Sequence, residues 1–103
     1  MYYSFIGKGI DGSLFKIQDD IGRVFVFKAS HQKRQIEYEE KIHFHIYNMI
    51  NCKKYIVKPL KLDNNIKAQI TKSIGFKHGY AMEYIEGVTL LKAFQMMRTF
   101  PTI

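Results

Sequence analysis

Three glycines near the N-terminus have a spacing that can bring a polypeptide backbone close to phosphate oxygens. Gly7, Gly9 and Gly12 form the pattern G-x-G-x-x-G within "IGKGIDGSLFKI". Because glycine has no Cβ, the backbone N–H groups around it can approach an anionic ligand closely. In a dinucleotide-binding fold the pattern follows a strand and opens a helix. Here "SLFKI" is typical of a strand. We therefore predict a strand–loop–strand flap over phosphates, with a plain hairpin turn as the alternative.

A lysine ends the apolar run that follows these glycines. In "VFVFK", Phe25 and Phe27 alternate with Val24 and Val26. This strand offers apolar side chains to both faces of a sheet and is predicted to be central. The preceding "QDDIG" is typical of a hairpin turn. Lys28 ends this strand, and a surface lysine at a strand end is the interpretation that the local pattern alone supports.

Residues 32–51 indicate a long helix. The segment "QKRQIEYEEKIHFHIYNMIN" contains neither glycine nor proline. Its apolar residues recur at the spacing of one helix face, and they are Ile42, Ile46, Met49 and Ile50. Its glutamates lie in the first half, where the helix dipole favours negative charge.

Two further strands are predicted after this helix, over residues 55–65 and 68–87, joined by a hairpin near "DNN". Pro59 lies in the first of them and indicates a sheet edge or a bulge. Residues 88–100 indicate a short amphipathic helix. This order predicts an α+β fold with a five-stranded antiparallel sheet, one long helix packed on it and a short C-terminal helix.

Length and composition predict a single globular domain. The chain has 103 residues, of which 47% are apolar and 24% charged, and this suits one core. We expect residues 1–87 to form the sheet-and-helix part and residues 88–103 a terminal helix and tail. No segment is typical of a signal peptide or a bilayer-spanning helix, and the single Cys52 indicates a reducing compartment. The sequence predicts a cytoplasmic or nuclear protein with no membrane partner.

The formal net charge of +7 favours acidic partners, but the lysines are scattered, which is typical of a solvated basic surface. His43 and His45 are two residues apart on the predicted helix, unlike zinc ligands, so we predict no metal site. The aromatic residues have strand and helix spacings more typical of a core than of base stacking, and they include Tyr2, Tyr3, Phe5, Tyr38, Phe44 and Tyr47. Nucleic acid is therefore a weak candidate. A small basic structural or nucleic-acid-associated protein of the virion type is kept as an alternative.

Taken together, these motifs resemble the small N-terminal lobe of eukaryotic-type protein kinases. "IGKGIDGSL" is similar to the glycine-rich loop, and "VFVFK" to the strand whose lysine pairs with the α- and β-phosphates. "AMEYIEG" is similar to the end of the strand that leads into the hinge. The resemblance extends over about residues 5–94, with the motifs in the family's order. It departs from the family at Asp11, where an aromatic residue is usual, and at Val26, where alanine is usual.

The resemblance implies a site for ATP or Mg-ATP, formed by Gly7, Gly9, Gly12, Leu14, Val26, Lys28, Met82, Glu83 and Ile85. Met82 would be the gatekeeper, and Tyr84 would lie with Glu83 and Ile85 in the adenine-contacting hinge. The long helix should supply a glutamate that pairs with Lys28. The apolar stripe slightly favours Glu39, and Glu40 is the alternative.

In the family, the catalytic loop and its metal-binding residues would follow residue 103. We therefore expect this chain to be non-catalytic on its own, a binding, regulatory or assembly module with weak residual ATP binding. The alternative is the ATP-binding part of an active Ser/Thr-type or atypical kinase whose large lobe is not in this chain. The apolar face after the hinge predicts a protein partner, namely a kinase-like lobe, a second copy or a larger assembly; its residues are Leu90, Leu91, Phe94 and Met97.

Overall fold

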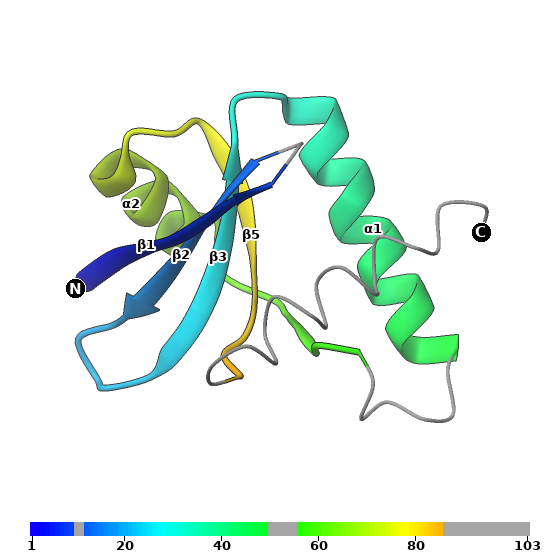
Figure 1. Ribbon diagram of the computed structural model, residues 1–103, viewed down its shortest axis with the longest axis horizontal. Coiled ribbons are helices and arrows are strands. Elements are labelled where there is room, and N and C mark those ends of the chain that lie inside the picture. The colour runs from blue at the N-terminus through cyan, green and yellow to red at the C-terminus, as the bar shows by residue number, and fades with distance from the viewer. Residues whose placement is uncertain (10–11, 50–55, 86–103) are drawn as a thin grey trace.

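A five-stranded antiparallel sheet lies between two helices (Figure 1) in the computed structural model, which describes residues 1–9, 12–49 and 56–85. The strand order is β1-β2-β3-β5-β4. The strands are β1 (Tyr2–Gly9), β2 (Gly12–Gln18), β3 (Val24–Ser30), β4 (Pro59–Leu60) and β5 (His78–Glu83), and the helices are α1 (Lys33–Met49) and α2 (Asn64–Ile74). The predicted α+β class, the antiparallel sheet and the long helix are confirmed. The predicted C-terminal helix lies outside the described residues.

β3 is the central strand of the sheet, as its alternating apolar residues predict. Phe25 and Phe27 face one side, where they pack in a cluster with Ile70 of α2. Val26 faces the other side, in a cluster with Ile36 of α1. Because both faces of β3 are covered, its side chains from Phe25 to Ser30 are buried.

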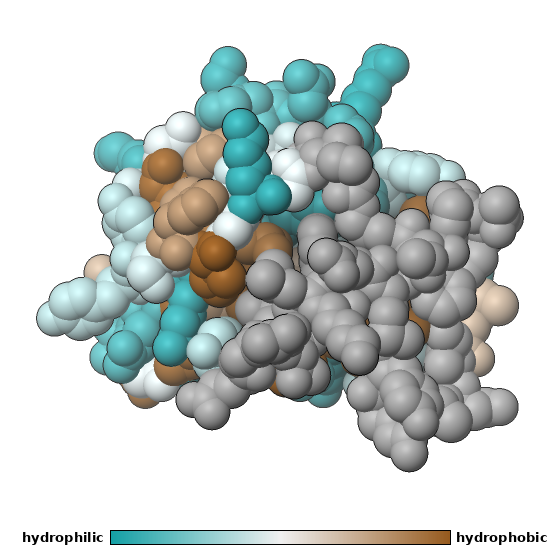
Figure 2. Space-filling model, viewed as in Figure 1, coloured by the Kyte–Doolittle hydropathy of each residue, from teal (hydrophilic) through white to brown (hydrophobic). Residues whose placement is uncertain are grey.

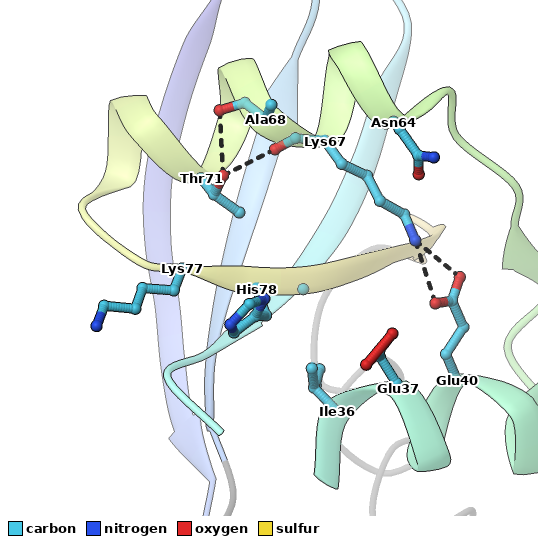
Figure 3. Close-up of a pocket in the computed structure, with 10 residues that line it drawn as sticks. Ile36, Glu37, Glu40, Asn64, Lys67, Ala68, Thr71, Lys77 and His78 are labelled. Atoms are coloured by element: carbon cyan, nitrogen blue, oxygen red, sulfur yellow. Dashed lines mark hydrogen bonds and ion pairs between the residues drawn. The ribbon is translucent and has the colours of Figure 1, made fainter. Parts of the chain in front are cut away.

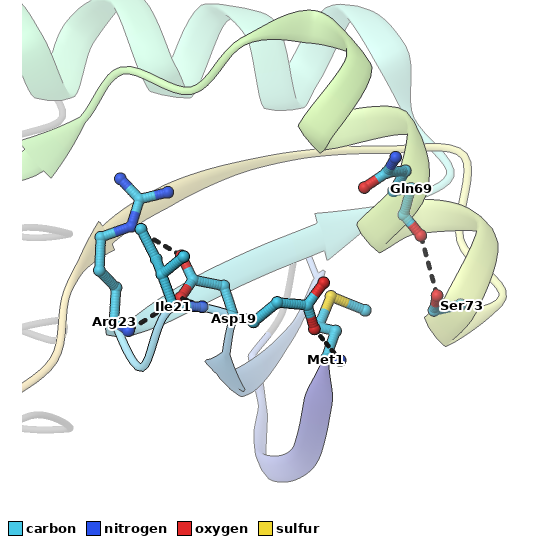
Figure 4. A network of polar contacts seen from close by, with 7 residues as sticks. Met1, Asp19, Ile21, Arg23, Gln69 and Ser73 are labelled. Carbon is cyan, nitrogen blue, oxygen red and sulfur yellow. Dashed lines mark hydrogen bonds and ion pairs between the residues drawn. The ribbon is translucent and has the colours of Figure 1, made fainter.

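The turn between β2 and β3 is held by one aspartate (Figure 4). Asp19 Oδ1 accepts hydrogen bonds from the backbone N–H groups of Ile21 and Arg23, at 3.1 and 2.8 Å. Asp19 Oδ2 is 2.6 Å from Arg23 Nε. Gly22 has φ +86°, a conformation that glycine adopts without strain. This turn confirms the predicted hairpin and brings Gln18 opposite Val24 in the ladder between the two strands.

The prediction of two long strands joined near "DNN" is wrong. A helix, α2, occupies Asn64–Ile74, and only Pro59–Leu60 and His78–Glu83 form strands in this region. The prediction that Pro59 lies at a sheet edge is confirmed, because β4 is the last strand in the sheet order.

Local signals explain this helix. Asp63 caps its N-terminus by accepting a hydrogen bond from the N–H of Asn65 at 2.7 Å. Gly75 ends it with φ +79° and donates its N–H to the carbonyl of Thr71. Ile66, Ile70 and Ile74 form the stripe that packs on the sheet. The "DNN" segment is thus a helix cap rather than a hairpin turn.

The predicted core role of the aromatic residues is wrong for four of them. Tyr2, Tyr3, Phe5 and Tyr38 are largely exposed, whereas Phe44 and Tyr47 are half-buried. Three of the exposed residues lie on β1, which pairs with β2 alone and forms an edge of the sheet. Figure 2 shows apolar side chains, in brown, on the part of the surface where β1 and β2 lie in Figure 1.

Neither helix in the described part of the chain combines the length and the apolar character that crossing a bilayer requires.

Candidate functional site

A buried lysine and a glutamate form the centre of the candidate site. Lys28 Nζ lies 2.6 Å from Oε1 and 2.5 Å from Oε2 of Glu39. The Lys28 side chain has no exposed surface, and that of Glu39 is 22% exposed. The pair joins the central strand β3 to α1. The structure thus decides between the two glutamates that the sequence left open, in favour of Glu39.

The other glutamate lies on a different side of α1. Glu40 accepts from Lys67 of α2, with both carboxylate oxygens 3.1 Å from Lys67 Nζ. Both side chains line an open pocket of about 290 Å³ between α1, α2 and the start of β5 (Figure 3). Successive helix residues are rotated by about 100°, so Glu39 and Glu40 meet different neighbours.

Two further polar side chains extend the pair into the core. The Tyr80 hydroxyl lies 3.2 Å from Glu39 Oε2 and 2.9 Å from His43 Nδ1. His43 Nε2 lies 2.7 Å from the carbonyl oxygen of Val57. Tyr80 is on β5, directly opposite Lys28 in the ladder with β3. A continuous row of contacts therefore leads from the Val57 carbonyl to the Lys28 ammonium.

Sequence reasoning missed His43 and Tyr80 as members of this site. One signal was available for His43, since it follows Glu39 by four residues and the two share a helix face. The position of Tyr80 depends on the pairing of β3 with β5, which no local pattern reveals.

The environment of His43 and Tyr80 determines the protonation state of each at neutral pH. Burial lowers the pKa of His43 below its usual 6.5, and the charge of Lys28 lowers it further. The hydrogen bond to Val57 and the charge of Glu39 raise this pKa, but burial outweighs them. Burial also raises the pKa of Tyr80 well above 10.0, as do the charges of Glu39 and Glu40 and its hydrogen bond to Glu39. At neutral pH the imidazole is therefore neutral and the phenol keeps its proton.

Acid should destabilise the fold through His43. Because its folded-state pKa lies below the unfolded value near 6.5, the unfolded chain binds more protons between those two values. The stability linked to His43 should be complete above that range, fall as the pH drops through 6.5, and level off below the folded-state pKa. Thermal unfolding of the wild type and of His43→Asn across this range measures the effect. Equal slopes in the two proteins would contradict it.

The glycine-containing hairpin lies beside Lys28. Gly9 pairs with Gly12 and Gly7 with Leu14, and the register shifts between Phe5 and Gly7. A Cβ on Gly12 would lie 2.6 Å from the Ala29 carbonyl oxygen and 3.4 Å from Lys28 Cε. Glycine at this position therefore allows β2 to pass close to β3 next to the lysine. Asp11 lies outside the described residues.

The apolar residues predicted to contact adenine come together in one cluster. Leu14, Val26 and Met82 are buried there, from three neighbouring strands. Val26 lies directly opposite Met82 in the sheet. Tyr84 and Ile85, from the predicted hinge, pack against the cluster. The structure thus gathers these dispersed residues next to the strand position of Lys28.

Glu83 has a different environment from these residues. Its backbone N–H donates to the Lys58 carbonyl at 2.9 Å, and its Oε1 accepts from the Lys58 N–H at 3.1 Å. Its carboxylate therefore anchors the chain that leads into the edge strand β4. The predicted partner face, Leu90, Leu91, Phe94 and Met97, lies outside the described residues.

Residues 1–9, 12–49 and 56–85 contain no group of three or more His, Cys, Asp or Glu side chains that could hold a metal ion.

Comparison of the chain with protein-family models, curated proteins and solved structures found no match. Function is accordingly inferred from the geometry around Lys28.

Proposed function

We propose that this protein is a nucleotide-binding module of the protein-kinase small-lobe type. In this proposal Lys28 binds the phosphates of ATP, or of Mg-ATP, and the protein acts as a binding, regulatory or assembly component without catalysis of its own. The observation that carries the proposal is the buried Lys28–Glu39 pair beside a glycine-containing hairpin.

The ion pair is better explained by a function than by stability. A buried salt bridge contributes little net stability, because desolvation of the two charges offsets most of their attraction. Its advantage is a fixed geometry, since the carboxylate holds the long lysine side chain in one position. An ammonium group held in this way loses less conformational entropy when it binds a phosphate.

The apolar cluster offers an environment suited to a purine ring. Ligand sites are lined mainly by apolar side chains with a few placed polar groups, and Leu14, Val26 and Met82 would supply that lining. These three side chains and Lys28 are buried. A nucleotide would therefore enter by separating the β1–β2 hairpin from Tyr84 and Ile85, so we expect binding to be weak.

The assembly role is supported by the exposed aromatic edge of the sheet. Tyr3 and Phe5 on β1 are 50% and 60% exposed, and aromatic side chains are enriched at protein interfaces. An edge strand also presents unpaired backbone groups to a partner.

Nucleotide binding is predicted to depend on Lys28. Titration calorimetry with ATP, with and without Mg²⁺, should show binding to the wild type and a loss of at least about tenfold for Lys28→Met. The double variant Lys28→Met/Glu39→Leu removes both charges of the Lys28–Glu39 pair and should be folded yet equally defective. Lys61→Met, which neutralises an exposed lysine, is the matched control and should bind like the wild type.

Two results would contradict the proposal. The first is a wild type without measurable ATP binding, or with the same affinity as Lys28→Met. The second is robust phosphotransfer by the isolated chain, which would overturn its non-catalytic part.

A further inference from the structure

Four groups from three parts of the chain form a row of hydrogen bonds in the core. The Val57 carbonyl precedes β4, His43 and Glu39 lie on α1, and Tyr80 lies on β5. His43 and Tyr80 are 1% and 0% exposed, so neither exchanges its partners for water. Two apolar side chains in place of His43 and Tyr80 would fill this space without the cost of desolvating polar groups.

The positions of the protons in this row follow from the Val57 carbonyl at its end. A carbonyl can only accept, so His43 Nε2 carries a hydrogen and donates it to Val57. In the neutral imidazole, Nδ1 then has only a lone pair, and it accepts from the Tyr80 hydroxyl. The hydroxyl has one hydrogen, and Glu39 Oε2 is a second acceptor 3.2 Å away, so with neutral His43 this hydrogen is shared between Nδ1 and the carboxylate.

Protonation of His43 reverses one of these hydrogen bonds and completes another. In the imidazolium, Nδ1 carries a hydrogen and donates it to the Tyr80 oxygen. The phenolic hydrogen then turns towards Glu39 Oε2, which is already 3.2 Å away. One proton added at His43 thus becomes one additional hydrogen bond donated to Glu39, and no covalent bond except N–H changes.

We propose that His43 and Tyr80 are positioning residues that form a relay, through which the protonation of His43 controls the carboxylate holding Lys28. The relay itself requires only the contacts described above. Its effect on nucleotide binding rests on the proposed function of Lys28.

The charged groups around His43 set the range in which the relay acts. On α1, Glu39 favours the imidazolium; on β3, Lys28 opposes it; on β5, Tyr80 supplies a neutral partner. Glu40 influences Tyr80 and is paired with Lys67 of α2. Because burial is the largest influence and lowers the pKa of His43, the relay acts below pH 6.5.

The expected consequence is tighter phosphate binding in acid. When Glu39 accepts from Tyr80, it shares its negative charge between two donors and neutralises Lys28 less. The imidazolium adds a positive charge nearby. Relative to His43→Asn, wild-type affinity for ATP should rise by about fivefold below the pKa of His43, a modest coupling between sites. The ratio of the two ATP affinities, wild type over His43→Asn, removes the contribution that the titration of ATP itself makes to both.

Carbon NMR of the nucleotide-free protein tests the relay directly. Resonances of the His43 imidazole, Tyr80 Cζ and Glu39 Cδ should be followed from about pH 8 to about pH 5, the range in which histidine titrates. We expect all three to change with one midpoint. In Tyr80→Phe the His43 change should persist and that of Glu39 should be lost. Tyr38→Phe, an exposed tyrosine on the same helix, should behave as the wild type.

Either of two outcomes overturns the relay. One is a flat Tyr80 Cζ or Glu39 Cδ resonance through the titration of His43, which is measured in the wild type and needs no variant to fold. The other is a Glu39 response that persists in Tyr80→Phe. Since these measurements use no nucleotide, a failure of ATP binding leaves the relay standing, and a flat Tyr80 resonance leaves the nucleotide proposal standing.

Discussion

Replacing Glu39 by leucine should lower the free energy of unfolding by about 3–5 kcal/mol, because it leaves the buried Lys28 ammonium without the charge of its carboxylate. The lysine side chain has no exposed surface through which water could replace that carboxylate. Chemical denaturation of the wild type and Glu39→Leu measures the difference.

The neighbouring glutamate provides a matched control. Glu40 pairs with Lys67, but both side chains retain 20% or more of their exposure. Glu40→Leu should therefore cost at most about 1 kcal/mol, the usual value of a solvent-accessible pair. The double variant Lys28→Met/Glu39→Leu should recover most of the loss, since neither charge remains. Equal costs for Glu39→Leu and Glu40→Leu would show that burial of Lys28 does not govern the effect.

Gly79→Ala should be nearly as destabilising, at about 3 kcal/mol, the upper end for overpacking a core. A Cβ at this position would overlap the Phe27 ring and would lie 2.5 Å from the Lys28 carbonyl oxygen. This oxygen belongs to the backbone of the central strand and cannot rotate away. β3 and β5 would have to separate next to Lys28 and Tyr80, and chemical denaturation of the variant measures the cost.

Gly75 is the appropriate comparison for this substitution. It has φ +79°, and a Cβ added there would have no atom within 4 Å. The only cost of alanine at this position is therefore the strain of its left-handed backbone conformation. That strain should cost about 1–2 kcal/mol. If Gly75→Ala proved the more damaging of the two, the close packing between β3 and β5 would be less restrictive than the structure indicates.

Much of the sheet could be predicted from local patterns. The alternation in "VFVFK" identified the central strand, because a strand buried on both faces needs apolar side chains at consecutive positions. Asp19 and Gly22 identified the turn before it, because their conformational preferences are local. Pro59 identified an edge, since proline has no N–H to donate to a neighbouring strand.

The helix α2 shows how a local signal can support two structures. Asp63 and the asparagines after it suit a turn as well as a helix cap, and the isoleucines that follow suit a strand or a helix. Packing of Ile66, Ile70 and Ile74 on the sheet favours the helix. A helical spacing of these three residues was present in the sequence, together with Gly75 as an end signal.

Local sequence was enough to identify the residue types of the candidate site: the glycines, Lys28, and a helix with Glu39 and Glu40 in its first half. The choice of glutamate needed the packed fold, because one helix residue rotates the side chain by about 100° towards a different neighbour. The place of Tyr80 opposite Lys28 needed it too, since it depends on the register between strands about fifty residues apart. The hydrogen-bonded row from Val57 to Lys28 exists only where β3, α1, β5 and the segment before β4 meet.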